Sequence, residues 1–177
     1  MKKTLVLFYS FTGNNEKLAK EIANYLSADY QAIHETNKRN FFTIVLDVVF
    51  NRTPHIYKPE NEIGQYEHVI FVAPIWLGKI ASPLRSVFKL YRENIRSYSF
   101  ISLSGGADGV NVGIEHELVS RLGKKPVKVD NPLIIDLLPT EPRPTRQQLE
   151  DYRLSDVDAS KVLGELESEL SQNSRSF

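Results

Sequence analysis

The chain of 177 residues is long enough to bury a substantial core and short enough to form a single domain. Its 22 basic residues balance 22 acidic ones, and this formal net charge of zero argues against nucleic acid or an anionic membrane surface as a partner. No cysteine occurs, which excludes disulfides, thiol nucleophiles and cysteine-ligated metal centres. Any redox chemistry must therefore come from a bound cofactor.

The first predicted strand, Leu5–Phe8, is a short apolar run of the kind that is buried on both faces of a parallel sheet. It follows Met1-Lys2-Lys3, but it is too short for a secretory signal, and no small-residue cleavage site comes after it. We therefore expect a cytoplasmic protein. We also expect one domain over residues 1–170 and a frayed tail over residues 171–177.

This strand runs into a turn of the sequence Tyr9-Ser10-Phe11-Thr12-Gly13-Asn14-Asn15, and a helix is predicted from Glu16 to about Ser27. Hydroxyl groups, a glycine and the unpaired N–H groups of a helix start together suit an anion such as a phosphate. The same residue types also serve simply as helix caps, and the turn taken alone leaves both interpretations open. The nucleotide-binding patterns that end in Gly-Lys-Ser/Thr or read Gly-x-Gly-x-x-Gly are absent.

Residues 30–33 alternate between polar and apolar side chains, which predicts a strand at the edge of the sheet. Residues 41–50 have the composition of a strand, but their place in the chain calls for a crossover helix, and we predict a helix. This segment is too short to span a bilayer and contains Asp47. Its apolar residues point almost all round, so it is either buried under residues 51–65, which we favour, or a subunit contact in a homodimer.

The next predicted strand, Val69–Ala73, leads into a loop of the sequence PIWLGKIASP over residues 74–83. This loop holds the only tryptophan, Trp76, beside the carboxyl end of the strand. Ser82 followed by Pro83 predicts the N-cap and the first residue of a helix. The apolar stripe of that helix consists of Leu84, Val87, Phe88, Tyr91 and Ile95.

Residues 100–103 form the fourth predicted strand, and a glycine-rich loop at residues 104–109 follows it. Gly123 predicts the end of the next helix. The apolar stripe of this helix is Ile114, Leu118 and Leu122. Residues 133–138 are the fifth predicted strand, because they are again a short run dominated by apolar residues.

A proline-rich break at residues 139–144 separates the fifth predicted strand from a helical C-terminal region. Thr145 and Gln148 predict a capping box, and Ser155 predicts the cap of a last helix. The apolar line of this last helix is Val162, Leu166 and Leu170.

The alternation of strands and helices predicts an α/β fold: a doubly wound five-stranded parallel sheet of strand order 2-1-3-4-5, with helices on both faces. In this order the loops after the first and third strands diverge to opposite faces. They open a crevice at the carboxyl ends of the strands, where ligands bind. The phosphate-like turn, the tryptophan loop and the glycine-rich loop all lead there, and glycines let a backbone lie flat against a ring.

These three loops resemble those of the flavodoxin family, and the resemblance covers nearly the whole chain. Ser10, Thr12 and Gly13 match the family's phosphate loop, Thr/Ser-x-Thr-Gly-x-Thr, whereas Asn15 stands where a last threonine is usual. Asn15 can still present an amide N–H, so we expect weakened rather than lost phosphate contact. The resemblance implies FMN as the cofactor and implies that it is bound by Ser10, Phe11, Thr12, Gly13, Asn14, Asn15, Pro74, Ile75, Trp76, Leu77, Gly78, Ser104, Gly105, Gly106, Ala107 and Asp108.

Two of these residues have alternative interpretations. Trp76 is implied to flank the isoalloxazine ring, which we favour over the alternative of a core aromatic at a helix entrance. A carboxylate at Asp108 would oppose the anionic reduced flavin and lower its potential, but ordinary turn formation explains this residue as well. The four histidines are scattered without metal-ligand spacing, so surface positions are predicted for His34, His55, His68 and His116 and no metal site.

We therefore hypothesise an FMN-binding oxidoreductase that accepts electrons or hydride at the flavin and passes them to a second substrate. An NAD(P)H-dependent reductase of a quinone-like acceptor is favoured over a one-electron carrier, because the neutral charge balance gives little steering toward a redox partner protein. The flavin supplies the chemistry, so no catalytic side chain is predicted. The alternative from another class is a binding or regulatory module that has lost the flavin, which the departure at Asn15 suggests.

Overall fold

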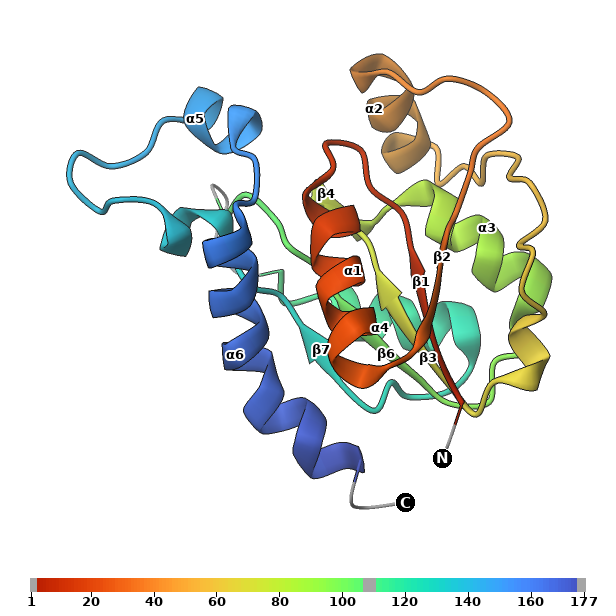
Figure 1. The fold of residues 1–177 in the computed structure, drawn as a ribbon. Coiled ribbons are helices and arrows are strands. Elements are labelled where there is room, and N and C mark those ends of the chain that lie inside the picture. Colours follow the sequence, from red (N-terminus) through yellow and green to blue (C-terminus); the bar gives the residue numbers. More distant parts are fainter. Residues whose placement is uncertain (1–2, 107–110, 175–177) are drawn as a thin grey trace.

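A five-stranded parallel sheet forms the centre of the molecule (Figure 1). The computed structural model describes residues 3–106 and 111–174, with residues 167–174 by their backbone alone. Across the sheet, the strands are β2 (Asp29–Ala32), β1 (Thr4–Phe8), β3 (His68–Val72), β6 (Tyr98–Ile101) and β7 (Val129–Asp130). Counted along the chain, this is the order 2-1-3-4-5, so the predicted doubly wound sheet is confirmed.

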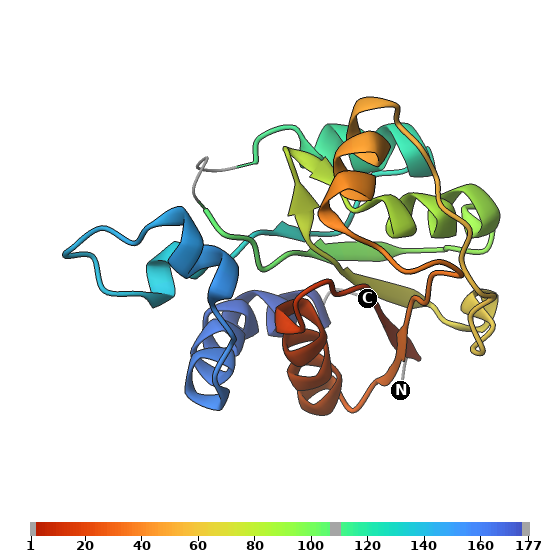
Figure 2. The same cartoon turned by 90° about the horizontal axis from the view of Figure 1, so that it is seen from above.

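Helices cover both faces of the sheet and give the molecule three layers (Figure 2). On one face, α1 (Asn14–Leu26) and α6 (Asp156–Ser174) pack side by side. The other face is covered by α3 (Ser82–Tyr91) and α4 (Ile114–Leu122). The crossover helix α2 (Phe41–Val49) lies against α3 on that same side of the sheet.

In the central strand β1, apolar residues occupy consecutive positions because both faces of the strand are buried. Leu5 and Leu7 are fully buried in the core that lies under α3 and α4. Val6 and Phe8 point to the opposite face and pack in the core that lies under α1 and α6. Full burial of one such side chain contributes about 1.5 to 3 kcal/mol, so a strand covered on both faces is strongly favoured by this sequence.

The prediction of a fifth strand at Leu133–Leu138 is wrong. The fifth strand is β7, four residues earlier, and Ile134–Leu137 forms a short 3-10 helix, η2. After a single bridge between Ser104 and Leu133, the backbone turns and forms local hydrogen bonds. The apolar run is instead packed into the core under α1 and α6. A short apolar run does not distinguish a strand from a buried helical turn, which is why the pattern misled.

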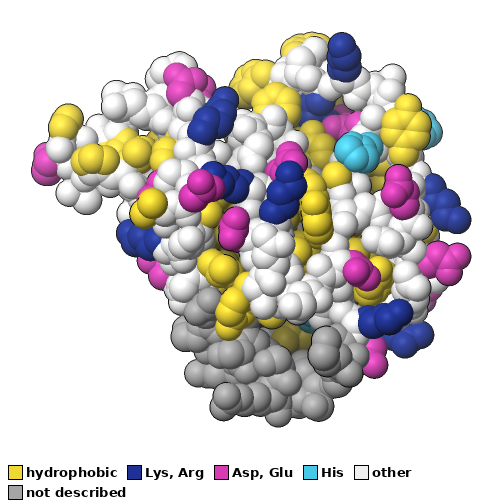
Figure 3. All heavy atoms as spheres, in the orientation of Figure 1, with side chains coloured by type: hydrophobic (Ala, Val, Ile, Leu, Met, Phe, Trp, Pro, Cys, Tyr) yellow, Lys and Arg dark blue, Asp and Glu magenta, His cyan; other side chains and the backbone are white. Residues whose placement is uncertain are grey.

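Helix α2 forms as predicted, but it is not buried. Asn40 starts the helix through a capping box with Thr43, and only Ile44 and Asp47 of the helix are buried. Several large apolar side chains are more than 60% exposed, namely Phe41, Phe42, Val49 and Phe50. Hydrophobic surface accordingly gathers at the upper edge of the molecule, where α2 and the loop after β1 lie (Figure 3).

The predicted cover for α2, residues 51–65, takes another path. Its middle pairs with the segment that follows β2: the Thr36 N–H donates to the His55 carbonyl at 3.1 Å, and the Tyr57 N–H donates to the His34 carbonyl at 2.9 Å. These backbone hydrogen bonds hold the segment beside β2. The prediction that it buries α2 is therefore wrong.

Most predicted helix ends are confirmed. Gly123 ends α4 in a left-handed conformation, with φ 72°. Thr145 and Gln148 form the predicted capping box of α5 (Arg146–Asp151). Ser155 caps α6, since its Oγ accepts from the Asp158 N–H at 3.0 Å.

Two predictions about helix ends need correction or extension. Ala81, not Ser82, is the N-cap of α3, and Ser82 instead donates its hydroxyl to Asp47 at 2.7 Å. In the last helix, Val162 and Leu166 are buried as the apolar line predicts. Its backbone continues to Ser174, while the side chain of Leu170 lies outside what the structure describes.

Among the described residues, no helix has both the length and the apolar character needed to cross a bilayer.

Candidate functional site

The three loops predicted to bind a ligand leave the sheet at the same edge. The last residues of the three adjacent strands β1, β3 and β6 lie in register: Phe8 pairs with Val72, and Val72 pairs with Ile101. Because the strands are parallel, the loop after each one begins at this common level. A ligand at this edge can therefore contact all three loops.

The structure places most of the predicted site residues at this edge. Those in the first two loops and at the start of the third are Ser10, Phe11, Thr12, Gly13, Asn14, Asn15, Pro74, Ile75, Trp76, Leu77, Gly78, Ser104, Gly105 and Gly106. Ala107 and Asp108 lie outside the described residues. Both interpretations of Asp108, an effect on the flavin potential and ordinary turn formation, therefore remain predictions.

The first loop has the geometry of an anion cradle. Gly13 caps α1 with φ 93°, a left-handed conformation that glycine adopts without strain. Its N–H donates to Ser10 Oγ at 3.0 Å and closes the turn. In the described part of the chain, no acceptor pairs with the N–H groups of Phe11, Thr12 or the first three residues of α1. The N-terminal end of α1, beside these donors, favours negative charge.

Two buried asparagines hold this cradle in place. The Asn15 amide donates to the Leu103 carbonyl and accepts from the Leu103 N–H, both at 3.0 Å. The Asn14 amide donates to the Tyr152 carbonyl at 3.0 Å and accepts from the Leu154 N–H at 2.9 Å. Both side chains are at most 5% exposed. The side chain of Asn15 is therefore engaged inside the protein, and its backbone N–H is what it leaves for a phosphate.

The second loop is a tight hairpin of two short strands, β4 (Ile75–Trp76) and β5 (Lys79–Ile80). Its two turn residues, Leu77 and Gly78, both adopt left-handed conformations, with φ 49° and φ 73°. This is the turn geometry that matches the twist of a two-residue hairpin. A leucine held there costs about 1 kcal/mol or more, and Leu77 is 64% exposed.

Trp76 connects the second loop to the first. Its ring meets Tyr9 and Phe11 edge-on, with centroids 5.7 and 6.4 Å apart. The guanidinium carbon of Arg39 lies 5.1 Å from the centroid of the indole, a cation–π contact. Trp76 is partly exposed, so it is neither a core aromatic nor a free surface side chain. Its orientation is fixed by neighbours from two other segments of the chain, the loop after β1 and the segment after β2.

Arg39 belongs to a buried network that sequence reasoning missed. It forms a two-point ion pair with Glu35, one bond of which is 2.7 Å long, and donates to Asp47 Oδ2 at 2.8 Å. All three side chains are less than 10% exposed. The Tyr9 hydroxyl donates to Glu35 at 2.8 Å, and burial together with Glu35 raises the pKa of Tyr9 above its ordinary value. Because Ser82 also donates to Asp47, the network joins the strand β1 to α2 and α3.

Two features of the sequence could have indicated this network. Asp47 is a single charge within an apolar helix, and a buried carboxylate needs a partner. Glu35 and Arg39 are four residues apart and lie close before that helix.

The third loop is fixed by η2. The Ile134 N–H donates to the Ser104 carbonyl at 2.8 Å, and the Ile135 N–H donates to the Gly105 carbonyl at 3.2 Å. Gly106 has φ 81°, and a Cβ there would lie 2.8 Å from Ile135 Cγ2. Only glycine fits at this position, so the loop backbone can run close to its support.

A pocket of about 440 Å³ opens beside the first loop. It lies between Tyr9, Ser10 and Phe11 on one side and residues 33–39, including Arg39, on the other. The predicted residues Ser10 and Phe11 therefore line a hollow together with the charged network.

Three of the four histidines are exposed as predicted: His34, His55 and His116. His68 is half-buried. Its ring nitrogens lie 2.9 Å from Ser97 Oγ and 3.1 Å from Ser99 Oγ, and burial lowers its pKa to about 4. Among the described residues, no three His, Asp or Glu side chains come together as metal ligands do.

Several solved structures have the same fold. A flavoprotein from Lactobacillus acidophilus NCFM, crystallised in complex with FMN, matches with a TM-score of 0.64 and 18% identity over 74% of this chain and 93% of that chain. The apo-form of the flavoprotein from the same organism matches with a TM-score of 0.58 and 19% identity over 75% and 93%. A protein from Bacteroides eggerthii DSM 20697 matches with a TM-score of 0.61 and 18% identity over 76% and 89%.

At these identities the likeness is one of fold, and the chain has a flavodoxin-like fold. No family model matches its sequence, and no curated protein matches it either.

Proposed function

We propose that this chain, whose flavodoxin-like sheet ends in three adjacent loops, binds FMN there and acts as a flavin-dependent oxidoreductase. One observation carries the proposal: an anion cradle, a partly exposed tryptophan and a glycine loop begin at the register-matched ends of β1, β3 and β6. The flavoprotein from Lactobacillus acidophilus, which has this fold, was crystallised with FMN.

The residues at this edge fit the two ends of FMN. The free N–H groups around Gly13 and the hydroxyls of Ser10 and Thr12 suit the phosphate. A charge-assisted hydrogen bond contributes about 1.5 to 3 kcal/mol, so three or four of them give roughly 5 to 10 kcal/mol before costs. Micromolar binding needs about 8 kcal/mol net of those costs, so contacts to the ring must add to the phosphate contacts. Trp76 and the backbone of Gly105 can supply them.

Bound FMN would supply transfer of hydride or of single electrons. The chain's own residues have a positioning role: the cradle holds the phosphate, and Trp76, fixed by Arg39 and Tyr9, restricts the ring. No side chain needs to carry a proton for electrons to enter, so we assign no catalytic residue.

A reductase of an uncharged, quinone-like acceptor suits this edge better than a one-electron carrier. The side chains around it that remain exposed include Phe11 at 46% and Leu77 at 64%. Apolar surface of this kind favours a flat uncharged acceptor, whereas a carrier gains speed from a charged docking face. NAD(P)H is the proposed electron donor, and it would approach the open face of the flavin.

The test is a titration of the purified chain with FMN, read by quenching of the single tryptophan and by the flavin absorbance. We expect saturation with one equivalent and a dissociation constant of about 1 μM or lower. Protein that stays colourless and unquenched would instead be a binding or regulatory module without flavin. With FMN bound, direct oxidation of NADH or NADPH by a quinone supports the reductase. Reduction that requires a separate reductase would make the protein a carrier.

A further inference from the structure

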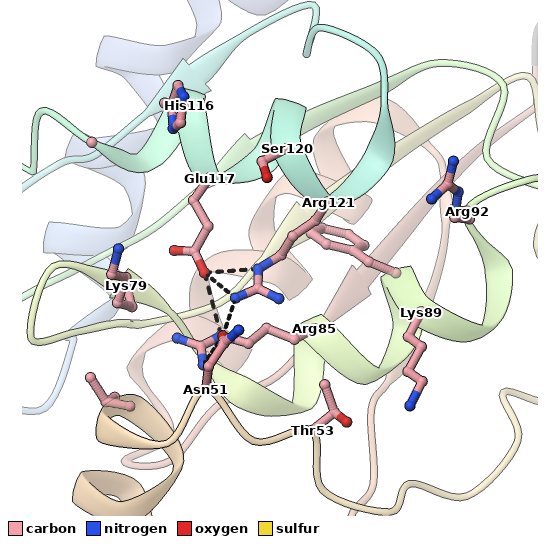
Figure 4. A pocket seen from close by; sticks show the side chains of 13 residues that line it. Asn51, Thr53, Lys79, Arg85, Lys89, Arg92, His116, Glu117, Ser120 and Arg121 are labelled. Carbon is pink, nitrogen blue, oxygen red and sulfur yellow. Dashed lines mark hydrogen bonds and ion pairs between the residues drawn. The ribbon is translucent and has the colours of Figure 1, made fainter.

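A second, larger pocket lies on the face of the sheet that α3 and α4 cover (Figure 4). Its volume is about 710 Å³, which is within the range of small-molecule sites. Its walls are the C-terminal part of α3 and the facing side of α4, with Asn51 and Thr53 closing one side. The β4–β5 hairpin reaches it through Lys79, and Gly113 lines it where α4 begins.

The lining of this pocket is strongly basic although the whole chain is neutral. Five cations and one carboxylate give the lining a formal charge of +4, and they are Lys79, Arg85, Lys89, Arg92, Arg121 and Glu117. The complete chain has 22 basic and 22 acidic residues. Positive charge is therefore concentrated here and compensated elsewhere on the molecule.

The cations form a row along one side of α3. Arg85, Lys89 and Arg92 are four and three residues apart, so they lie on one face over about 10 Å of helix length. Arg121, which is four residues after Glu117, faces this row from α4 (Figure 4). The spacing suits a ligand with several linked negative groups better than a single small anion.

The floor of the pocket is fixed by buried polar contacts. Arg85 is 2% exposed; its Nε donates to the Ile80 carbonyl at 3.1 Å and lies 3.4 Å from Glu117 Oε1. The same Glu117 oxygen accepts from Arg121 at 2.8 Å, and the other oxygen accepts from the Ile80 N–H at 2.9 Å. One carboxylate thus serves two guanidinium groups. Asn51 Oδ1 completes the floor by accepting from Arg121 at 2.6 Å and Arg85 at 3.3 Å.

The remaining cations are free to turn toward a ligand. Lys79 and Lys89 are exposed and form no ion pair with any residue of the described chain. Within residues 3–106 and 111–166, Arg92 pairs only with Glu93, and both side chains are more than half exposed, so this pair contributes little. An anion could therefore recruit three cations without breaking a buried interaction.

We propose that this groove is a second binding site, separate from the flavin edge, for a small molecule that carries at least two linked phosphate groups. Guanidinium groups match phosphate oxygens with paired hydrogen bonds, and lysine adds point charges. Val48, which is half-buried, contributes apolar surface to the lining, which would suit the base of a nucleoside diphosphate. The neutral chain and the limited volume favour a small molecule over a nucleic acid polymer.

The test is isothermal titration calorimetry of the complete chain with ADP and, separately, with pyrophosphate. Both titrations use protein saturated with FMN, or the chain alone if FMN does not bind. We expect a dissociation constant below about 100 μM for ADP at about 0.1 M salt. Comparable binding of pyrophosphate would assign recognition to the phosphates, and tighter binding of ADP would add a contact to the nucleoside. Absence of binding for both probes at about 1 mM would overturn the proposal.

A matched pair of variants decides where the ligand binds. The change Lys89→Ala with Arg92→Ala removes two exposed cations of the groove and should weaken ADP binding about tenfold or more. The change Arg96→Ala with Lys125→Ala removes the same charge outside the groove and should weaken it less than about twofold. Equal losses in the two variants would mean non-specific attraction and would also overturn the proposal. FMN affinity should be the same in both variants, so this test and that of the flavin site fail independently.

Discussion

His68 is a half-buried base on a central strand, and it makes the stability of the fold depend on pH. Burial lowers its pKa to about 4 in the folded chain, whereas the ordinary value is 6.5. Between these values the unfolded chain takes up a proton that the folded chain does not. The contribution of a neutral His68 is therefore complete above pH 6.5 and is lost as the pH falls toward 4, by up to about 3 kcal/mol.

The variant His68→Gln should lose this part of the pH dependence. We expect its free energy of unfolding to fall by about 2 kcal/mol less than that of the unchanged protein between pH 7.5 and pH 4.5. Urea unfolding followed by circular dichroism measures the difference. His34→Gln is the control, because His34 is exposed and its removal should leave the pH dependence as it was. The same loss of stability in all three proteins would contradict the role of His68.

Trp76 is the residue on which the proposed ring contact depends. The variant Trp76→Ala should weaken FMN binding more than about tenfold, because both ring stacking and buried area are lost. Trp76→Phe keeps an aromatic face and should weaken binding less. The fluorescence of FMN itself reports on both, since neither variant contains tryptophan. An unchanged dissociation constant in Trp76→Ala would remove this residue from the site.

At the scale of elements, α2 is unusual because polar contacts hold it more than apolar ones do. Ile44 is its one buried apolar side chain, while Asp47 accepts hydrogen bonds from Arg39 and Ser82. Arg85 donates in addition to the Asp47 carbonyl at 3.2 Å. Loss of one partner from a buried ion pair typically costs about 3 to 5 kcal/mol, because the other charge stays buried.

The variant Asp47→Ala should therefore open α2 without unfolding the sheet. We expect hydrogen exchange in residues 41–49 to become faster while β1 and β3 keep their protection, because no residue of α2 belongs to either of the two cores. Glu60→Ala, which removes an exposed carboxylate, is the control and should leave the exchange unchanged. Unaltered protection of α2 in Asp47→Ala would mean that apolar contacts suffice to hold it.

The elements that could be predicted from the sequence are those that bury side chains at regular positions along their whole length. The run Leu5–Phe8 and the spacing of Leu18, Ile22 and Leu26 identify a strand and a helix because each element faces a core along its whole length. The run at residues 133–138 failed because its burial comes from a short helical turn. The exposure of α2 could not be foreseen, since it depends on where residues 51–65 pair.

The candidate site was predictable to a similar degree. The positions of its loops follow from the strand order, so Ser10 and Trp76 could be expected at one edge. Hydrogen-bond partners that are far apart in the sequence could not be predicted. Nothing near Asn15 in the sequence indicates its partner Leu103, which lies 88 residues away. The ring contact of Arg39 likewise depends on the path of the chain after β2.

At the scale of the whole molecule, bound FMN should stabilise the fold by mass action. At a free concentration of about 100 times its dissociation constant, it should raise the free energy of unfolding by about 2.7 kcal/mol. For a chain of this size, that corresponds to a melting temperature higher by about 5 °C or more. Differential scanning calorimetry measures the shift, and riboflavin without the phosphate is the control, with a smaller effect expected. A melting temperature that does not change when FMN is added would contradict the proposed function.

The hydrogen bonds of Asn14 join the two ends of the chain. Its partners, Tyr152 and Leu154, come about 140 residues later, immediately before the last helix. On the ribosome, β1 and the turn after it emerge before these partners, so this support is missing until residues 152–154 have been made. A nascent chain would therefore acquire a firmly held cradle only after Leu154 has been added, and a product cut short before residue 152 would lack that support however well its sheet had formed.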